Sequence, residues 1–155
     1  LQKIVDYADI IYIGGGNTKS MLAVFREWGL DKILINAYKS GKILAGVSAG
    51  AICWFEKGVT DSWAHGLRVM ECMEVLEGCC CPHYDGEKNR RPSVMKFIEE
   101  NTISSCLAIE DGSAVHFKDN KLHTAVSFYE DKESYHVSKK YDQIIEEKLT
   151  RINLY

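Results

Sequence analysis

The chain has 155 residues, of which 46% are hydrophobic and 26% are charged, a composition typical of one globular domain and not of a disordered segment. Its net charge of -3 gives no electrostatic reason to expect nucleic acid or an anionic membrane as a partner. No apolar run is long enough for a membrane span, and the N-terminus lacks the layout of a signal peptide. We therefore expect a cytoplasmic protein.

Six cysteines are present, and Cys79, Cys80 and Cys81 are consecutive. Neighbouring residues alternate faces of a strand, which makes a poor disulfide framework, so we expect reduced thiols. The alternative is a zinc site, because Cys79, Cys81 and His83 share one face of an extended strand. However, no second pair of ligands with the usual spacing follows. We therefore predict no metal.

The chain begins with a helical pattern over residues 2–7, followed by the apolar run Ile-Ile-Tyr-Ile at residues 10–13. Such a run is typical of a buried parallel strand. The sequence Gly-Gly-Gly-Asn-Thr at residues 14–18 comes directly after it and exposes backbone amides. It has neither the spacing nor the Lys-Ser/Thr ending of nucleotide-binding loops, which argues against that function.

Two helices and a strand are predicted next. Asn17 or Thr18 is expected to cap a helix that ends at Gly29, and a second helix covers residues 31–40. The apolar residues 43–47 then predict another buried strand. This strand leads into the stretch that carries the most chemistry.

The sequence Gly46-Val47-Ser48-Ala49-Gly50 stands between that strand and a helix start. A Gly-x-Ser-x-Gly turn in this setting lifts the serine hydroxyl clear of the backbone, and small neighbours let the turn close. Ser48 is therefore the candidate nucleophile. The alternative is a serine that merely caps the helix.

This alternation of strands and helices predicts an α/β fold with a mainly parallel sheet and helices on both faces. Sites in such sheets form at the carboxyl ends of the strands, so the glycine loop and Ser48 are expected at one edge. The amide of Ala49 and that of Gly15 or Gly16 are then placed to form an oxyanion hole.

The rest of the chain reads as a polar loop at residues 58–62, a short strand that Pro82 ends, a helix over residues 92–101 and a strand at residues 106–109. A hairpin is predicted from residues 114–117 and 122–128, followed by a charged, amphipathic tail from residue 130. We find no linker and expect a single domain.

Ser48 needs a histidine base and a carboxylate that orients it. His83 follows a strand at its carboxyl end and is the predicted base. The acid is Glu110 or Asp111, which follow the next buried strand, with Asp61 as a third candidate. The other histidines lie in a loop, the hairpin or the tail: His65, His116, His123 and His136.

These parts resemble the peptidase E family, serine dipeptidases related to cyanophycinase that share a fold with class I glutamine amidotransferases. The resemblance covers residues 2–128 and is carried by four motifs in the family's order: the glycine loop at 14–18, the elbow at 46–51, Pro-His-Tyr at 82–84 and Glu-Asp-Gly at 110–112. It implies a triad of Ser48, His83 and an acid before glycine, which is Asp111. It also implies an oxyanion hole in the glycine loop.

The resemblance has two departures. Aspartyl dipeptidases carry an arginine for the substrate's acidic side chain in a Gly-Glu-Thr-Arg stretch, where this chain has Gly-Glu-Lys-Asn-Arg-Arg, so Arg90 or Arg91 is the candidate for that role. Asn17, Thr18 and Asp61 are further candidates for substrate binding. Family members also have strands and helices ahead of the glycine loop, so we expect a chain that lacks those N-terminal units.

We therefore predict a serine exopeptidase that acts on dipeptides or short peptides and needs no cofactor. The expected partner is a small peptide, with no nucleic acid or membrane, and a homo-oligomer is left open. One alternative is an α/β-hydrolase-type esterase, which shares the elbow but predicts the order Ser, acid, His. The other is a non-catalytic binding protein that retains the elbow.

Overall fold

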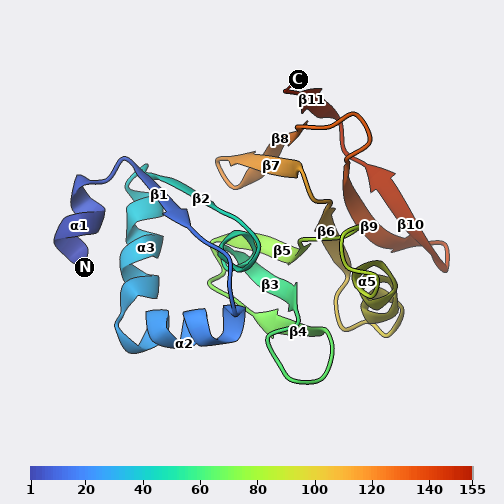
Figure 1. The fold of residues 1–155 in the computed structure, drawn as a ribbon, viewed down its shortest axis with the longest axis horizontal. Helices are drawn as coiled ribbons and strands as arrows, with labels where there is room; N and C mark the ends of the chain where they lie inside the picture. The colour runs from blue at the N-terminus through green and yellow to red at the C-terminus, as the bar shows by residue number, and fades with distance from the viewer. Residues whose placement is uncertain (155) are drawn as a thin grey trace.

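The computed structural model describes residues 1–154 and has an α/β fold (Figure 1). None of the helices in this range has the length and apolar character needed to cross a membrane. The first half of the chain contains α1 (Gln2–Tyr7), β1 (Ile10–Ile13), α2 (Thr18–Glu27), α3 (Leu30–Lys39), β2 (Ile43–Gly46), α4 (Ala49–Ile52), β3 (Phe55–Thr60) and β4 (Arg68–Glu71). The second half contains β5 (Leu76–Cys81), α5 (Arg90–Glu99), β6 (Ser105–Ile109), β7 (Ser113–Lys118), β8 (Lys121–Ser127), β9 (Ser134–Lys140), β10 (Gln143–Lys148) and β11 (Arg151–Asn153).

Strands β1 and β2 form a parallel pair in which Ile13 lies opposite Gly46. Helices α2 and α3 connect them, as the pattern predicts, and Asn17 caps α2 because its side-chain oxygen accepts the Ser20 N–H at 2.9 Å. The glycine loop and the Ser48 turn therefore leave neighbouring strands at the same end. This confirms the prediction that the glycine loop and Ser48 lie at the same edge of the sheet.

A larger sheet has the strand order β10-β9-β6-β5-β3-β4. Its centre, β6-β5-β3, is parallel, whereas β4, β9 and β10 pair antiparallel. The α/β class is confirmed, with parallel strands at the centre. However, the flanking strands differ from a mainly parallel sheet, and β1–β2 is a separate sheet within residues 1–154.

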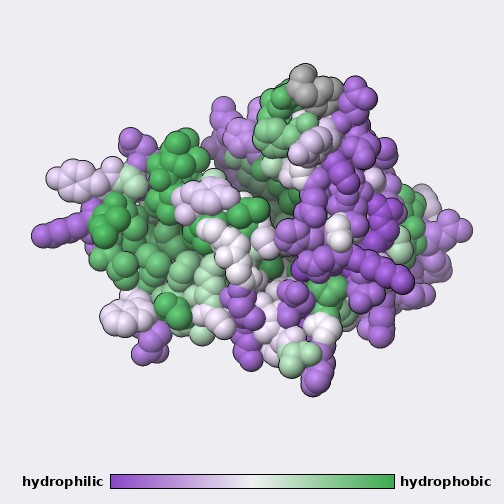
Figure 2. Space-filling view, in the orientation of Figure 1, coloured by the Kyte–Doolittle hydropathy of each residue, from purple (hydrophilic) through white to green (hydrophobic). Residues whose placement is uncertain are grey.

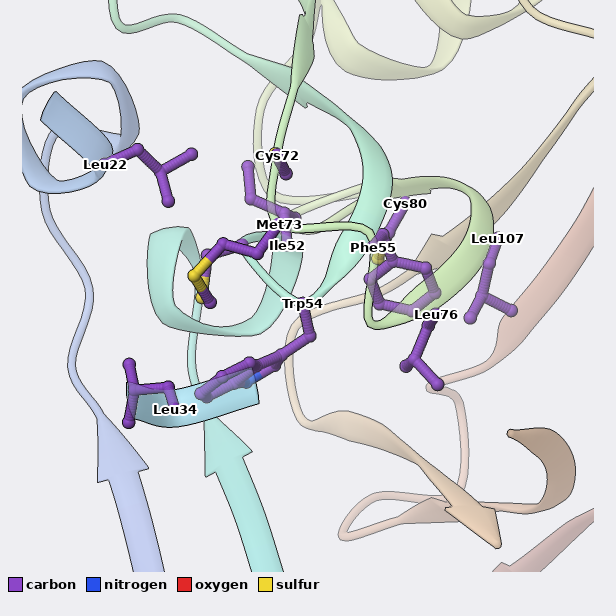
Figure 3. Packing of buried hydrophobic residues seen from close by; sticks show 11 residues of the cluster. Leu22, Leu34, Ile52, Trp54, Phe55, Cys72, Met73, Leu76, Cys80 and Leu107 are labelled. Atoms are coloured by element: carbon purple, nitrogen blue, oxygen red, sulfur yellow. The ribbon is translucent and has the colours of Figure 1, made fainter. Parts of the chain in front are cut away.

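The large sheet is covered on both faces. Cys80 packs in one core with Leu22, Leu34 and Ile52 from the N-terminal helices (Figure 3). Cys79 and Cys81 pack in a second core with residues of α5 such as Val94 and Ile98. The three consecutive cysteines thus alternate faces, and all six cysteines are buried and free, as predicted.

Two segments differ from the sequence prediction. Residues 58–60 belong to β3 and not to a polar loop, because the backbone pairs with β4 and β5 and Val59 is fully buried. Gly58 leaves room there for Ile52, whose side chain a Cβ would meet at 2.9 Å. The charged tail forms β9, β10 and β11, and β9 packs beside β6. In both segments, pairing with distant strands and not the local sequence determines that the chain forms a strand.

The hairpin prediction is confirmed by β7 and β8. Asp119 and Asn120 form its turn at φ values of 52° and 61°, the left-handed backbone that tight hairpins require. Strand β11 then adds to β8 in parallel.

The outer face of the β1–β2 pair is apolar and exposed. Ile10, Tyr12 and Ile43 are 60%, 64% and 59% exposed, and Figure 2 shows hydrophobic residues gathered over this side, whereas hydrophilic residues dominate the side of β9 and β10. The opposite face of the pair carries Ile11, Ile13 and Leu44, which pack against the first core.

Candidate active site

The turn at Ser48 has an unusual backbone. Ser48 has φ 55° and ψ -118°, a conformation that L residues rarely adopt and that functional sites often contain. A Cβ at Gly50 would overlap the carbonyl of Ile13, and one at Gly46 would overlap the carbonyl of Gly50. Both glycines are therefore required for the turn to pack against the end of β1.

His83 joins Ser48 to a carboxylate. Its Nε2 lies 2.9 Å from Ser48 Oγ, and its Nδ1 lies 2.6 Å from Asp111 Oδ1. An ionised carboxylate only accepts hydrogen bonds, so Nδ1 carries the proton in this pair and Nε2 is free to accept the hydroxyl proton of Ser48. The predicted nucleophile, base and acid are thus brought together.

Of the predicted acids, the structure places Asp111 against His83 and the other two elsewhere. Glu110 is 7% exposed. Its Oε1 accepts from Arg91 at 3.2 Å, and its Oε2 accepts from the Glu133 N–H at 3.0 Å. Asp61 lies 3.7 Å from Arg90.

The glycine loop lies beside Ser48. The glycine loop passes so close that a Cβ at Gly15 would lie 3.3 Å from Ser48 Cβ. The N–H groups of Gly15, Gly16 and Ala49 donate to no backbone acceptor within residues 1–154. These three amides therefore stay the candidate donors to a developing oxyanion. Ser48, His83 and Asp111 line a cavity of about 170 Å³.

Asn17 and Thr18 both have hydrogen-bond partners within the protein, although Asn17 is exposed and Thr18 is buried. Besides capping α2, Asn17 donates to the Ser62 carbonyl at 3.2 Å. Thr18 is 1% exposed and bonds to Thr60 at 3.2 Å. This position is at odds with the predicted role of Thr18 in substrate binding, and both side chains serve to tie the glycine loop to the end of β3.

Arg90 is also at odds with its predicted role. It is 3% exposed, and its Nε and Nη2 donate to the two oxygens of Glu87 at 2.9 and 3.0 Å, while Nη1 donates to the Val59 carbonyl at 3.1 Å. Burial opposes the charge, but the bonds to Glu87 outweigh it and raise the pKa of Arg90. Arg90 is a buried anchor for the segment after His83.

Arg91 is half-buried and has its own internal partners. It donates to Glu110 at 3.2 Å and to Glu146 at 3.3 Å, and it lies over the Tyr84 ring at 4.7 Å from the centroid. Although burial opposes its charge, Tyr135, Glu146 and Tyr84 raise the pKa of Arg91. Neither predicted arginine is therefore a free cation for an acidic substrate.

Asp85 and Lys132 are residues of the site that the sequence reasoning misses. Asp85 Oδ1 accepts the Asp111 N–H at 2.9 Å, and its Oδ2 pairs with Lys132. Burial opposes ionisation of Asp85, but the bonds from Lys132 and from the Asp111 N–H hold its pKa below the ordinary value. The available signal was an acid two residues after the predicted base.

Within residues 1–154, no group of three or more His, Cys, Asp or Glu side chains is arranged to hold a metal.

Gly50→Ala is expected to lower the free energy of unfolding by about 1–3 kcal/mol, because the new methyl overlaps the backbone of β1. Gly14→Ala is the matched control, since no atom lies within 4 Å of its Cβ position, and its effect is expected to stay within about 0.5 kcal/mol. Urea unfolding followed by circular dichroism measures both. Equal losses in the two variants would show that the close approach does not matter.

Arg90→Met is expected to cost about 1–3 kcal/mol of stability, because it leaves the buried Val59 carbonyl without the Arg90 donor, whereas the exposed Glu87 carboxylate is hydrated instead. The ratio of activity on peptides with N-terminal Asp to activity on neutral peptides is expected to stay unchanged. Lys88→Met removes an exposed cation and is the control. A drop in that ratio with wild-type stability would instead identify Arg90 as a substrate ligand.

Comparison with known proteins identifies the family of this chain. The model of peptidase family S51 matches residues 1–125. The uncharacterized peptidase YgaJ of Bacillus subtilis (strain 168) is 47% identical over 138 residues, which are 89% of this chain and 60% of that protein. Peptidase E of Streptomyces coelicolor (strain ATCC BAA-471 / A3(2) / M145) is 28% identical over 129 residues, which are 70% of this chain and 49% of that protein.

The fold is also found among solved structures. The crystal structure of a candidate peptidase E protein from Listeria monocytogenes EGD-e superposes with a TM-score of 0.64 at 20% identity, covering 83% of this chain and 64% of that one. The chain thus spans about 60% of the length of YgaJ and about half that of the Streptomyces relative. Because the family model matches residues 1–125, which are more than half of the chain, the chain belongs to peptidase family S51.

Proposed function

We propose that the protein is a serine exopeptidase that hydrolyses dipeptides or short peptides through Ser48, His83 and Asp111. The observation that carries the proposal is the continuous path from Ser48 Oγ through the two nitrogens of His83 to Asp111 Oδ1, with distances of 2.9 and 2.6 Å. Membership of family S51 supports the same chemistry.

The geometry suggests how the reaction proceeds. Ser48 Oγ attacks the scissile carbonyl while His83 Nε2 takes its proton and then gives that proton to the leaving amine. Asp111 holds the imidazole in the required tautomer and stabilises its charged form. The amides of Ala49 and of Gly15 or Gly16 bind the oxyanion, and a water molecule then releases the acyl group by the same steps in reverse.

The size and charge of the site bear on the substrate. The cavity at Ser48 has about 170 Å³, which is below the range of about 300–1,000 Å³ usual for larger ligands. This supports a short peptide. Since Arg90 and Arg91 are engaged by Glu87, Glu110 and Glu146, we expect no preference for an acidic side chain through these residues.

The order of the residues favours this proposal over an esterase of the α/β-hydrolase type. That class has the acid before the histidine in the chain, whereas Asp111 follows His83. A cytoplasmic location and a homo-oligomer stay predictions from the sequence.

Fluorophosphonate is expected to label the full-length protein at Ser48, and a dipeptide library is expected to yield free amino acids. Ser48→Ala is the control and should lose both properties, because no other group replaces the nucleophile. A folded wild-type protein that stays unlabelled would exclude a catalytic serine and favour a binding protein. Labelling combined with cleavage of esters alone would favour the esterase.

Asp111→Asn is expected to lower kcat by about 10⁴-fold, because an asparagine does not hold His83 in the working tautomer. Glu110→Gln is the matched variant on the neighbouring residue. Its effect is expected to fall on stability and not on kcat, since Glu110 bonds to Arg91 and to the Glu133 backbone. Steady-state kinetics and thermal unfolding separate the two effects. An equal fall of kcat in both variants would contradict the assignment of Asp111.

A further inference from the structure

The three residues after His83 lie against β6 and the residues that follow it. The Tyr84 N–H donates to the Ile109 carbonyl at 3.0 Å. Asp85 Oδ1 accepts the N–H of Asp111 at 2.9 Å. A Cβ at Gly86 would overlap Oδ2 of Asp111, so the carboxylate rests against the glycine backbone.

We propose that Asp85 and Gly86 are positioning residues for the Asp111 carboxylate, and through it for His83; this proposal rests on the proposed function. Asp85 holds the backbone of Asp111 from one side. Gly86 leaves the space that the carboxylate occupies when Oδ1 faces His83. The base and the support for its acid thus belong to one short stretch of chain, residues 83–86.

Asp111 needs such support because little else restrains it. Its side chain is 53% exposed, and the residue follows the end of β6 and is not paired in the sheet. An exposed carboxylate on a loop is free to rotate. A misplacement of about 1 Å in a catalytic group costs about 100-fold in rate, so the position of Asp111 has to be set by its neighbours.

Lys132 completes the arrangement by holding Asp85. The two side chains form an ion pair and are 28% and 22% exposed. Asp85 therefore has one oxygen directed at the Asp111 N–H and the other at Lys132. Charge on Asp85 strengthens both bonds, since hydrogen bonds to an ionised acceptor are the stronger kind.

The first test compares three variants of the full-length protein. Asp85→Ala is expected to slow fluorophosphonate labelling of Ser48 about 100-fold. Asp85→Asn keeps an oxygen for the Asp111 N–H but loses the ion pair with Lys132, so it is expected to label at a rate between that of the wild type and that of Asp85→Ala. Asp131→Ala removes an exposed carboxylate next to Lys132 and is the control, expected to match the wild type. A wild-type rate in Asp85→Ala, or an equally slow rate in Asp85→Asn, would overturn the proposal.

A second test uses Gly86→Ala, which acts without removing any hydrogen-bonding group. The new methyl meets only the carboxylate end of Asp111, which can rotate away, so thermal unfolding is expected to change little. The displaced carboxylate no longer faces His83, and labelling is expected to slow about as much as in Asp85→Ala. Wild-type labelling in Gly86→Ala would overturn the role of Gly86.

A third measurement does not depend on activity. The proton on His83 Nδ1 is expected to give a low-field NMR resonance because it is bonded to Asp111, and this resonance is expected to move upfield or vanish in Asp85→Ala and Gly86→Ala. A wild-type protein that shows the resonance but is not labelled would contradict the proposed function and leave the positioning role supported. An unchanged resonance in both variants would overturn the positioning role.

Discussion

Gly50 lies against the carbonyls of Ile13 and Gly14, and Gly46 lies against the carbonyl of Gly50, so the elbow and the end of β1 touch through backbone atoms alone. This contact sets the position of Ser48. The chain turns sharply there, Ser48 has a φ of 55°, and its hydroxyl meets His83 Nε2. The contact also brings the glycine loop, at Gly15, beside Ser48.

The site is assembled between two sheets. Ser48 follows β2 in the small sheet, whereas His83 and Asp111 follow β5 and β6 in the large one. Residues 52–55 connect the two parts, and their side chains are buried in the first core together with Leu22 and Leu34 (Figure 3). The hydrogen bond between Ser48 and His83 therefore depends on the packing of the first core. Mutations in this core are expected to change activity as well as stability.

Two adjacent carboxylates have different environments. Glu110 points into the protein and is paired with Arg91, while Asp111 points toward His83 and solvent. Successive residues at the end of a strand face opposite sides, so one strand end supplies both a structural and a candidate catalytic carboxylate. The segment after β5 likewise serves two purposes. His83 contacts Ser48, and its near neighbours Asp85 and Gly86 contact Asp111.

Local patterns in the sequence were enough to predict the parts of the site that depend on backbone conformation. The elbow, the glycine loop, a helix cap at Asn17 or Thr18 and the alternation of the three cysteines follow from turn chemistry and from the two-residue period of strands, both of which act over a few residues. Which side chains contact one another was decided only by the tertiary structure. Whether Glu110 or Asp111 meets His83, whether Arg90 faces substrate or Glu87, and whether residues 55–60 form a strand depend on contacts between segments far apart in the chain. Such contacts are set by how the sheets and helices pack together, and a single sequence does not contain that packing in any local pattern.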